Sequence, residues 1–197
     1  MSDTVKTMTL LQEEPEETLS MNPKRFALWL FIVSILMMFA SMTSAYLVRR
    51  AEGDWLEFDV PRIFWYSTAV LLVSSVSMQW AYIAAKKDNF AALKTAISIT
   101  FVFGLVFLGM QFQGWKDLVA QNVYFVGNPA GSFMYVFTGL HAFHLITGLV
   151  VLLFALRSAF RMKTHSKELT GIQIANTYWH FLDVLWVYLF GFLLYFN

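Results

Sequence analysis

The stretch that decides the fold reads IQIANTYWHFLDVLWVYLFGFLLYF and covers residues 172–196. A helix needs about 20 predominantly apolar residues to cross a bilayer, so this stretch is long enough to span a membrane. Asp183 lies inside it, and an ionisable side chain at the centre of a span costs roughly 2.5–3.5 kcal/mol on insertion scales. Such a residue usually has a partner. His180 lies three residues earlier, on the same face of the predicted helix.

Composition extends this prediction to the whole chain. Of the 197 residues, 58% are hydrophobic and only 14% are charged, whereas a soluble domain carries about 25% charged residues. The net charge of +1 gives no general case for nucleic-acid binding. Cysteine is absent, which excludes disulfides, thiolate metal sites and a cysteine nucleophile. We therefore predict an integral membrane protein.

Four earlier apolar stretches also have the length of a membrane span. They cover residues 26–48, 63–85, about 95–115 and 132–156. The predicted fold class is therefore all-α, a bundle of five transmembrane helices over residues 25–197. Residues 1–24 are predicted to be a polar, flexible N-terminal tail without the apolar core of a signal peptide.

Basic residues outside the spans predict the orientation, because cytoplasmic loops carry an excess of Lys and Arg. One side of the predicted bundle holds the larger group, which is Lys6, Lys24, Arg25, Lys86, Lys87, Lys94, Arg157, Arg161, Lys163 and Lys167. The opposite side holds Arg49, Arg50, Arg62 and Lys116. We therefore expect the N-terminus in the cytoplasm and the C-terminus outside, which in a bacterium is the periplasm.

Ionisable side chains well inside the spans occur only in the last two. In the fourth span, His141, His144 and Gly148 are spaced i, i+3 and i+7 and share one stripe. Gly148 would allow a neighbouring helix to approach closely. A similar arc of the fifth span carries Trp179, His180, Asp183 and Trp186.

Helical rise places His144 and Asp183 at similar depths. At about 1.5 Å per residue, His144 lies ~18 Å below the outer end of its span and Asp183 ~16 Å above the inner end of its own. Both are near the middle of a hydrocarbon core that is ~30 Å thick. A polar contact between them is expected if the two stripes face each other.

Three interpretations of this cluster are open. Buried ionisable groups usually pair, which favours a hydrogen-bonded polar knot between packed helices. The same residues would also suit a proton or ion relay. Ligation of a haem or metal by His144 and His180 is the third interpretation, because imidazole is a common ligand. The residues alone indicate no reaction.

Two helices carry motifs of a known family. Residues 132–148, SFMYVFTGLHAFHLITG, resemble the phenylalanine-rich Thr-Gly-x-His-x-x-His-x-x-x-Gly helix of subunit III of haem-copper oxidases. Residues 178–186, YWHFLDVLW, resemble the Tyr-Trp-His-Phe-Val-Asp-x-x-Trp motif of that family's last helix. Gln111 fits a glutamine that the family carries near the end of the third span. The resemblance begins at about Phe26 and is to the short, five-helix bacterial form.

The resemblance implies an accessory, non-redox subunit of a proton-pumping aa3-type cytochrome c oxidase in aerobic respiration. Such a subunit lies in the bacterial cytoplasmic (inner) membrane beside the catalytic subunit I, in a complex with subunit II and other respiratory subunits. It stabilises subunit I and its proton uptake, and it binds phospholipid in a cleft. The haems and copper belong to partner subunits, so no catalytic residue, cofactor or metal is expected in this chain.

The two stripes are then expected to form a structural polar seam or a lipid cleft, made by His141, His144, Gly148, Trp179, His180, Asp183 and Trp186. The chain has four histidines in all, fewer than the haems and copper of a catalytic subunit require. The alternatives are the equivalent subunit of a quinol oxidase, a nitric oxide reductase-associated protein, and a stand-alone b-type membrane cytochrome.

Two positions depart from the family pattern. Ile35 stands where the family usually has an intramembrane glutamate, and Gly114 replaces a second frequent glutamate. Any role of those carboxylates in binding lipid headgroups or supplying protons therefore does not transfer to this chain. The departures favour a structural role.

Overall fold

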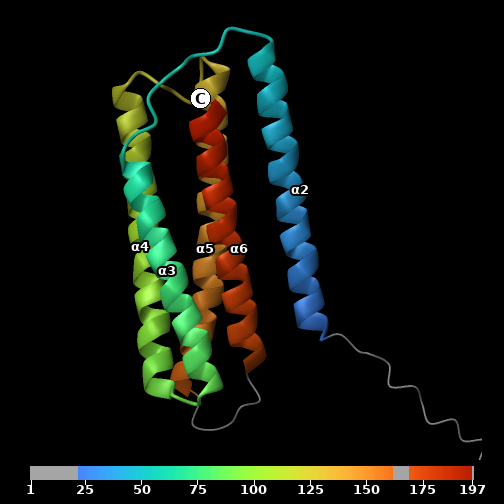
Figure 1. The fold of residues 1–197 in the computed structure, drawn as a ribbon, viewed down its shortest axis with the longest axis vertical. Coiled ribbons are helices and arrows are strands. Elements are labelled where there is room, and N and C mark those ends of the chain that lie inside the picture. Colours follow the sequence, from blue (N-terminus) through green and yellow to red (C-terminus); the bar gives the residue numbers. More distant parts are fainter. Residues whose placement is uncertain (1–21, 162–168, 197) are drawn as a thin grey trace, which may run out of the picture.

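The computed structural model describes residues 22–161 and 169–196, and within these ranges the chain is helical with short connections. Its helices are α2 (Pro23–Ala51), α3 (Ile63–Lys86), α4 (Phe90–Ala120), α5 (Pro129–Arg161) and α6 (Leu169–Phe196) (Figure 1). All five are long and apolar enough to cross a membrane, which confirms the predicted fold class. Helix α2 begins at Pro23, inside the stretch predicted to be a tail.

Asparagine caps start three of the helices. Asn89 accepts a hydrogen bond from the backbone N–H of Ala92 at 3.1 Å, which starts α4 before the predicted span. Asn128 accepts one from the backbone N–H of Ala130 at 2.9 Å and precedes the proline that opens α5. Asn22 caps α2 in the same way. Such caps satisfy backbone donors that have no partner within the helix.

Helices α3, α4, α5 and α6 form an antiparallel bundle in which each helix packs against two others. Helix α2 lies outside this bundle and packs mainly against α5 and α6 (Figure 1). It turns one stripe toward them, whose buried residues are Ile32, Ile35, Phe39, Thr43 and Tyr46. The spacing of three and four residues is that of a single helical face.

Both ends of α2 are tied to α6. At one end, the Tyr46 hydroxyl donates a hydrogen bond to the backbone oxygen of Phe196 at 3.0 Å, and its ring packs edge-on against Trp55. At the other end, the Arg25 guanidinium donates to the side-chain oxygen of Gln173. These pairs make α2 run parallel to α6.

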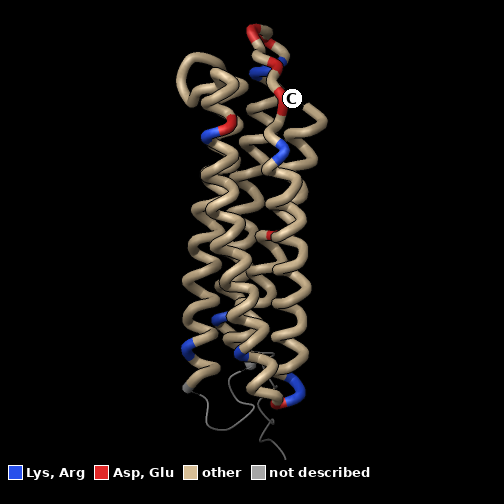
Figure 2. Tube along the Cα trace, turned by 90° about the vertical axis from the view of Figure 1, so that its left-hand side faces the viewer, with Lys and Arg blue, Asp and Glu red and all other residues tan. Residues whose placement is uncertain are grey.

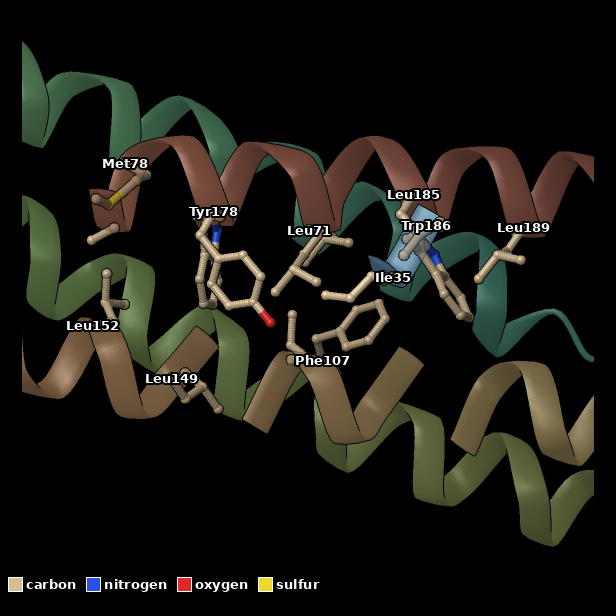
Figure 3. Packing of buried hydrophobic residues seen from close by; sticks show 14 of the residues in the cluster. Ile35, Leu71, Met78, Phe107, Leu149, Leu152, Tyr178, Leu185, Trp186 and Leu189 are labelled. Atoms are coloured by element: carbon tan, nitrogen blue, oxygen red, sulfur yellow. The ribbon is translucent and has the colours of Figure 1, made fainter. Parts of the chain in front are cut away.

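The interior of the bundle is apolar. Leu71 of α3, Phe107 of α4 and Trp186 of α6 point into the same interior (Figure 3), and each is at most 1% exposed. Ile35, at 2% exposed, belongs to the same cluster of buried apolar side chains. Charged residues gather at the two ends of the bundle, apart from one acidic position midway along it (Figure 2).

Candidate functional site

Polar side chains of α6 bond to hydroxyl groups of α3. The Trp179 Nε1–H donates to Ser74 Oγ at 2.8 Å, and the Trp186 Nε1–H donates to Thr68 Oγ1 at 2.9 Å. Both indoles are 1% exposed. The acceptors lie about two helical turns apart, as do the two tryptophans, so α3 and α6 are joined in register.

His180 continues the same row of bonds toward the outer surface. Its Nδ1 lies 2.7 Å from Ser75 Oγ, and its Nε2 lies 3.3 Å from Gln79 Oε1. The Gln79 oxygen can only accept, so a neutral imidazole satisfies both bonds when Nε2 carries the hydrogen. Its Nδ1 then accepts the hydroxyl hydrogen of Ser75. We call the side chains that meet along these two helices the α3–α6 seam; they are Thr68, Ser74, Ser75, Gln79, Trp179, His180, Asp183 and Trp186.

Asp183 lies behind His180 in this seam. Its side chain is 4% exposed, and Oδ2 is 4.0 Å from Nδ1 of His180. His180 is the neighbour that the i, i+3 spacing predicted, but at this distance the two groups form no hydrogen bond. Neither carboxyl oxygen has a hydrogen bond among the described residues. The Ser75 hydroxyl lies nearby, but its hydrogen is directed at His180 when that ring is neutral.

The structure does not bring His144 and Asp183 together. His144 of α5 turns toward α2, where its ring lies 6.5 Å from the Phe31 ring and 5.9 Å from the Phe39 ring, measured between centroids. Its Nδ1 is 2.7 Å from the backbone oxygen of Leu140, one turn earlier in its own helix. The expected contact is absent because His144 turns toward α2, although the other two members of its stripe, His141 and Gly148, do face α6.

The same geometry separates His144 from His180. One imidazole lies against α2 and the other against α3. Paired axial ligands would have to face each other across one plane, so this arrangement contradicts the haem site on which the b-type cytochrome alternative rests. Among the described residues there is also no group of three or more His, Cys, Asp or Glu that could hold a metal ion.

His141 is fully buried between aromatic rings. Its ring centroid lies 4.8 Å from that of Trp186 and 5.8 Å from that of Phe107. Neither ring nitrogen has a hydrogen-bond partner among the described residues. His141 therefore acts as a packing residue between α4, α5 and α6.

Gly148 permits close packing, as the sequence predicted. A Cβ added there would lie 2.8 Å from Cδ1 of Leu182 and 3.6 Å from the ring of Trp179. Gly104 of α4 is also pressed against Trp179, since an added Cβ would lie 2.8 Å from its Cη2 and 2.7 Å from Cδ2 of Leu149. The Trp179 indole thus occupies a slot between two glycines.

Sequence reasoning missed the α3 half of the seam. Within an apolar span it weighed ionisable groups and passed over hydroxyls, although α3 carries Ser67, Thr68, Ser74, Ser75 and Ser77. The same hydroxyls serve α4. Ser77 Oγ lies 2.6 Å from Thr100 Oγ1, and Gln111 donates to Ser67 Oγ at 3.4 Å. A count of hydroxyl-bearing residues in the second span would have found this surface.

Comparison with known proteins identifies the family. The family model described as cytochrome c oxidase subunit III matches residues 56–197. This chain belongs to the cytochrome c oxidase subunit III family. The motif resemblance is thereby confirmed, and the chain is a multi-pass membrane subunit of a haem-copper oxidase complex.

Three relatives illustrate the range of this family. A probable cytochrome c oxidase subunit 3 of Nocardia farcinica is 32% identical over 172 residues, covering 82% of this chain and 82% of the relative. Cytochrome c oxidase subunit 3 of Thermostichus vulcanus is 32% identical over 174 residues, covering 83% of this chain and 82% of the relative. Cytochrome bo(3) ubiquinol oxidase subunit 3 of Buchnera aphidicola is 28% identical over 181 residues, covering 89% and 88% respectively.

Packing accounts for the two departures from the pattern of the cytochrome c oxidase subunit III family. A Cβ added at Gly114 would lie 2.7 Å from Cζ of Phe64, whose ring is 1% exposed. A glutamate would have to displace this ring. Ile35 is buried in the apolar cluster, where a carboxylate would lose its hydration. At both positions, the surroundings in this chain are apolar and closely packed, which fits the residues present.

Proposed function

We propose that this chain is the accessory, non-redox subunit III of a proton-pumping aa3-type cytochrome c oxidase. One observation carries the proposal: residues of both family motifs are used to hold helices together. Trp179 and Trp186 bond to α3, and His141 packs between rings of α4 and α6. Because these side chains join helices, they favour a structural role for the chain. In that role it stabilises the catalytic subunit I and its proton uptake.

The distribution of charge supports insertion in a bacterial cytoplasmic membrane with the N-terminus inside. One end of the bundle holds the start of α2, the α3–α4 connection and the end of α5. Its described residues include six basic ones and one acidic one, Asp88; the basic ones are Lys24, Arg25, Lys86, Lys87, Lys94 and Arg157. The other end combines basic residues with acidic ones (Figure 2). By the positive-inside rule, the first end faces the cytoplasm. Lys6, Lys163 and Lys167 lie outside the described residues.

Cytochrome c is the proposed electron donor of the complex. The Nocardia and Thermostichus relatives, at 32% identity, are both named for cytochrome c oxidase, while the relative named for a ubiquinol oxidase is 28% identical. A quinol-oxidising complex is the second candidate because of that relative. The partner subunits distinguish the two candidate complexes, because oxidation of cytochrome c requires a copper-binding subunit II.

A phospholipid is the proposed ligand of this chain, beside α2 at its basic end. A pocket of about 260 Å³ there is lined by Arg25, Trp29, Tyr82 and Gln173, among others. The Lys86 ammonium lies 4.6 Å from the centroid of the Tyr82 ring. Two cations and an interfacial tryptophan suit a phosphate headgroup at the membrane surface. A larger pocket of about 810 Å³ lies between α2 and α5. None of the seven residues predicted for a lipid cleft lines either of these two pockets.

Purification through an affinity tag on this chain tests the proposal. The expected product contains a catalytic subunit with two haems and copper, a copper-binding subunit II and a stoichiometric amount of phospholipid. The chain produced alone should show no Soret absorption. A stoichiometric haem in the isolated chain, or the absence of any haem-copper partner in the purified material, would overturn the proposal.

A further inference from the structure

Two polar side chains of the α3–α6 seam reach the outer surface inside the membrane. Gln79 is exposed, and the His180 side chain is 33% exposed. At about 1.5 Å per residue, Gln79 lies ~10 Å from Lys86 at one end of α3 and ~26 Å from Arg62 at the other. The ~30 Å hydrocarbon core therefore contains both groups.

Gln79 has hydrogen-bonding capacity that this chain does not use. Its Oε1 accepts from His180, but its amide nitrogen has no hydrogen-bond partner among the described residues. Lipid tails offer no acceptor, and an unsatisfied polar group in hydrocarbon costs several kcal/mol. The phosphates of lipid headgroups are ~10 Å away along the helix at the nearer end. An acceptor at this depth has to come from another protein segment.

The surface around this polar spot is apolar and continuous across two helices. Leu72 and Val76 of α3 are 50% and 71% exposed, and Val184 and Val187 of α6 are 68% and 44% exposed. All four are spaced three, four or seven residues from Gln79 or His180, so each helix turns them to the same side as its polar residue. Figure 1 views this face, with α3 in front of α4 and α6 in front of α5.

We infer that this face of α3 and α6 docks a transmembrane helix of the oxidase's catalytic subunit, with an acceptor on that helix receiving the Gln79 amide hydrogen. The acceptor is a hydroxyl, a side-chain amide oxygen or an accessible backbone carbonyl. Helices associate in membranes through van der Waals packing and hydrogen bonds of this kind. The inference rests on the proposed function, because membership of an oxidase complex supplies the partner.

Photo-crosslinking in the assembled oxidase tests the location of the surface. p-Benzoylphenylalanine replaces Val76 or Val184 on the proposed face, and Val102 of α4 or Leu153 of α5 as exposed controls on other helices. The first two positions should cross-link to the haem-carrying subunit, and the two controls should not. Cross-links to a second copy of this chain or to lipid alone, or links to the haem-carrying subunit from the control positions only, would overturn the inference.

Removal of the amide tests its contribution. Gln79→Leu should speed dissociation of this chain from the detergent-solubilised oxidase by about 3- to 30-fold, the range for a membrane hydrogen bond. The control is Gln113→Leu, because Gln113 is an exposed glutamine that bonds to Asp117 of its own helix. It should leave the rate unchanged. Equal rates for the two variants would refute the role of Gln79. Failure of the wild-type chain to co-purify with a haem protein would instead refute the proposed function.

Discussion

Replacing Gly104 with alanine should destabilise the bundle by crowding the slot that holds Trp179. The added Cβ would lie 2.7 Å from Cδ2 of Leu149 and 2.8 Å from Cη2 of Trp179. Contacts this short require a shift of buried neighbours, and such overpacking costs about 1–3 kcal/mol. Alanine also gains roughly 0.5–1 kcal/mol over glycine inside a helix. The net loss is therefore expected to be about 0–2.5 kcal/mol.

Gly109 provides a matched control on the same helix, because a Cβ added there meets nothing within 4 Å. Gly109→Ala should gain the helix propensity without the crowding, so the two variants should differ by about 1–3 kcal/mol. The measurement is equilibrium unfolding in mixed micelles as SDS is increased, followed by circular dichroism. In a Trp179→Phe background, Gly104→Ala should cost less, since one of the two crowding atoms, Cη2 of Trp179, is gone while Cδ2 of Leu149 remains. Equal stabilities of the two alanine variants would refute the account of the slot.

Three further substitutions probe individual hydrogen bonds by the same unfolding assay. Thr68→Val leaves the indole N–H of Trp186 without its acceptor and should cost about 0.6–2 kcal/mol; no loss would mean that the bond contributes nothing. Asp183→Asn should not destabilise the bundle, because the carboxyl oxygens accept no hydrogen bond among the described residues; a loss above about 1.5 kcal/mol would contradict this geometry. Tyr46→Phe removes the bond to Phe196 and should accelerate hydrogen exchange in α2 but not in α4; unchanged exchange in α2 would contradict its anchoring role.

Asp183 shows how far reasoning from the residues reached. Its position beside His180 followed from one helix, because positions three residues apart on a helix lie on the same face whatever surrounds them. The helices themselves were predictable for a similar reason. A run of about 20 apolar residues has few alternatives to a membrane span, since every backbone polar group must be satisfied within the segment.

The partners across helices were not predictable in this way. Helical rise led us to expect His144 and Asp183 at similar depths, but contact also requires the right rotation of each helix about its axis. That rotation is decided by packing, such as the fit of Trp179 between Gly104 and Gly148. The hydroxyl groups of α3 also gave little signal, because serine and threonine in a span often bond to their own helix, as Ser67 does with Phe64.

The sequence by itself determined the five spans and, through its motifs, membership of the cytochrome c oxidase subunit III family. Only the tertiary structure decided that the polar seam joins α6 to α3, that His144 faces α2, and that Gln79 and His180 reach the outer surface. The physical reason is that the hydrophobicity and the rise of a helix depend only on the residues of that one segment. The pairing of faces depends instead on side-chain shapes and hydrogen bonds contributed by several helices at once.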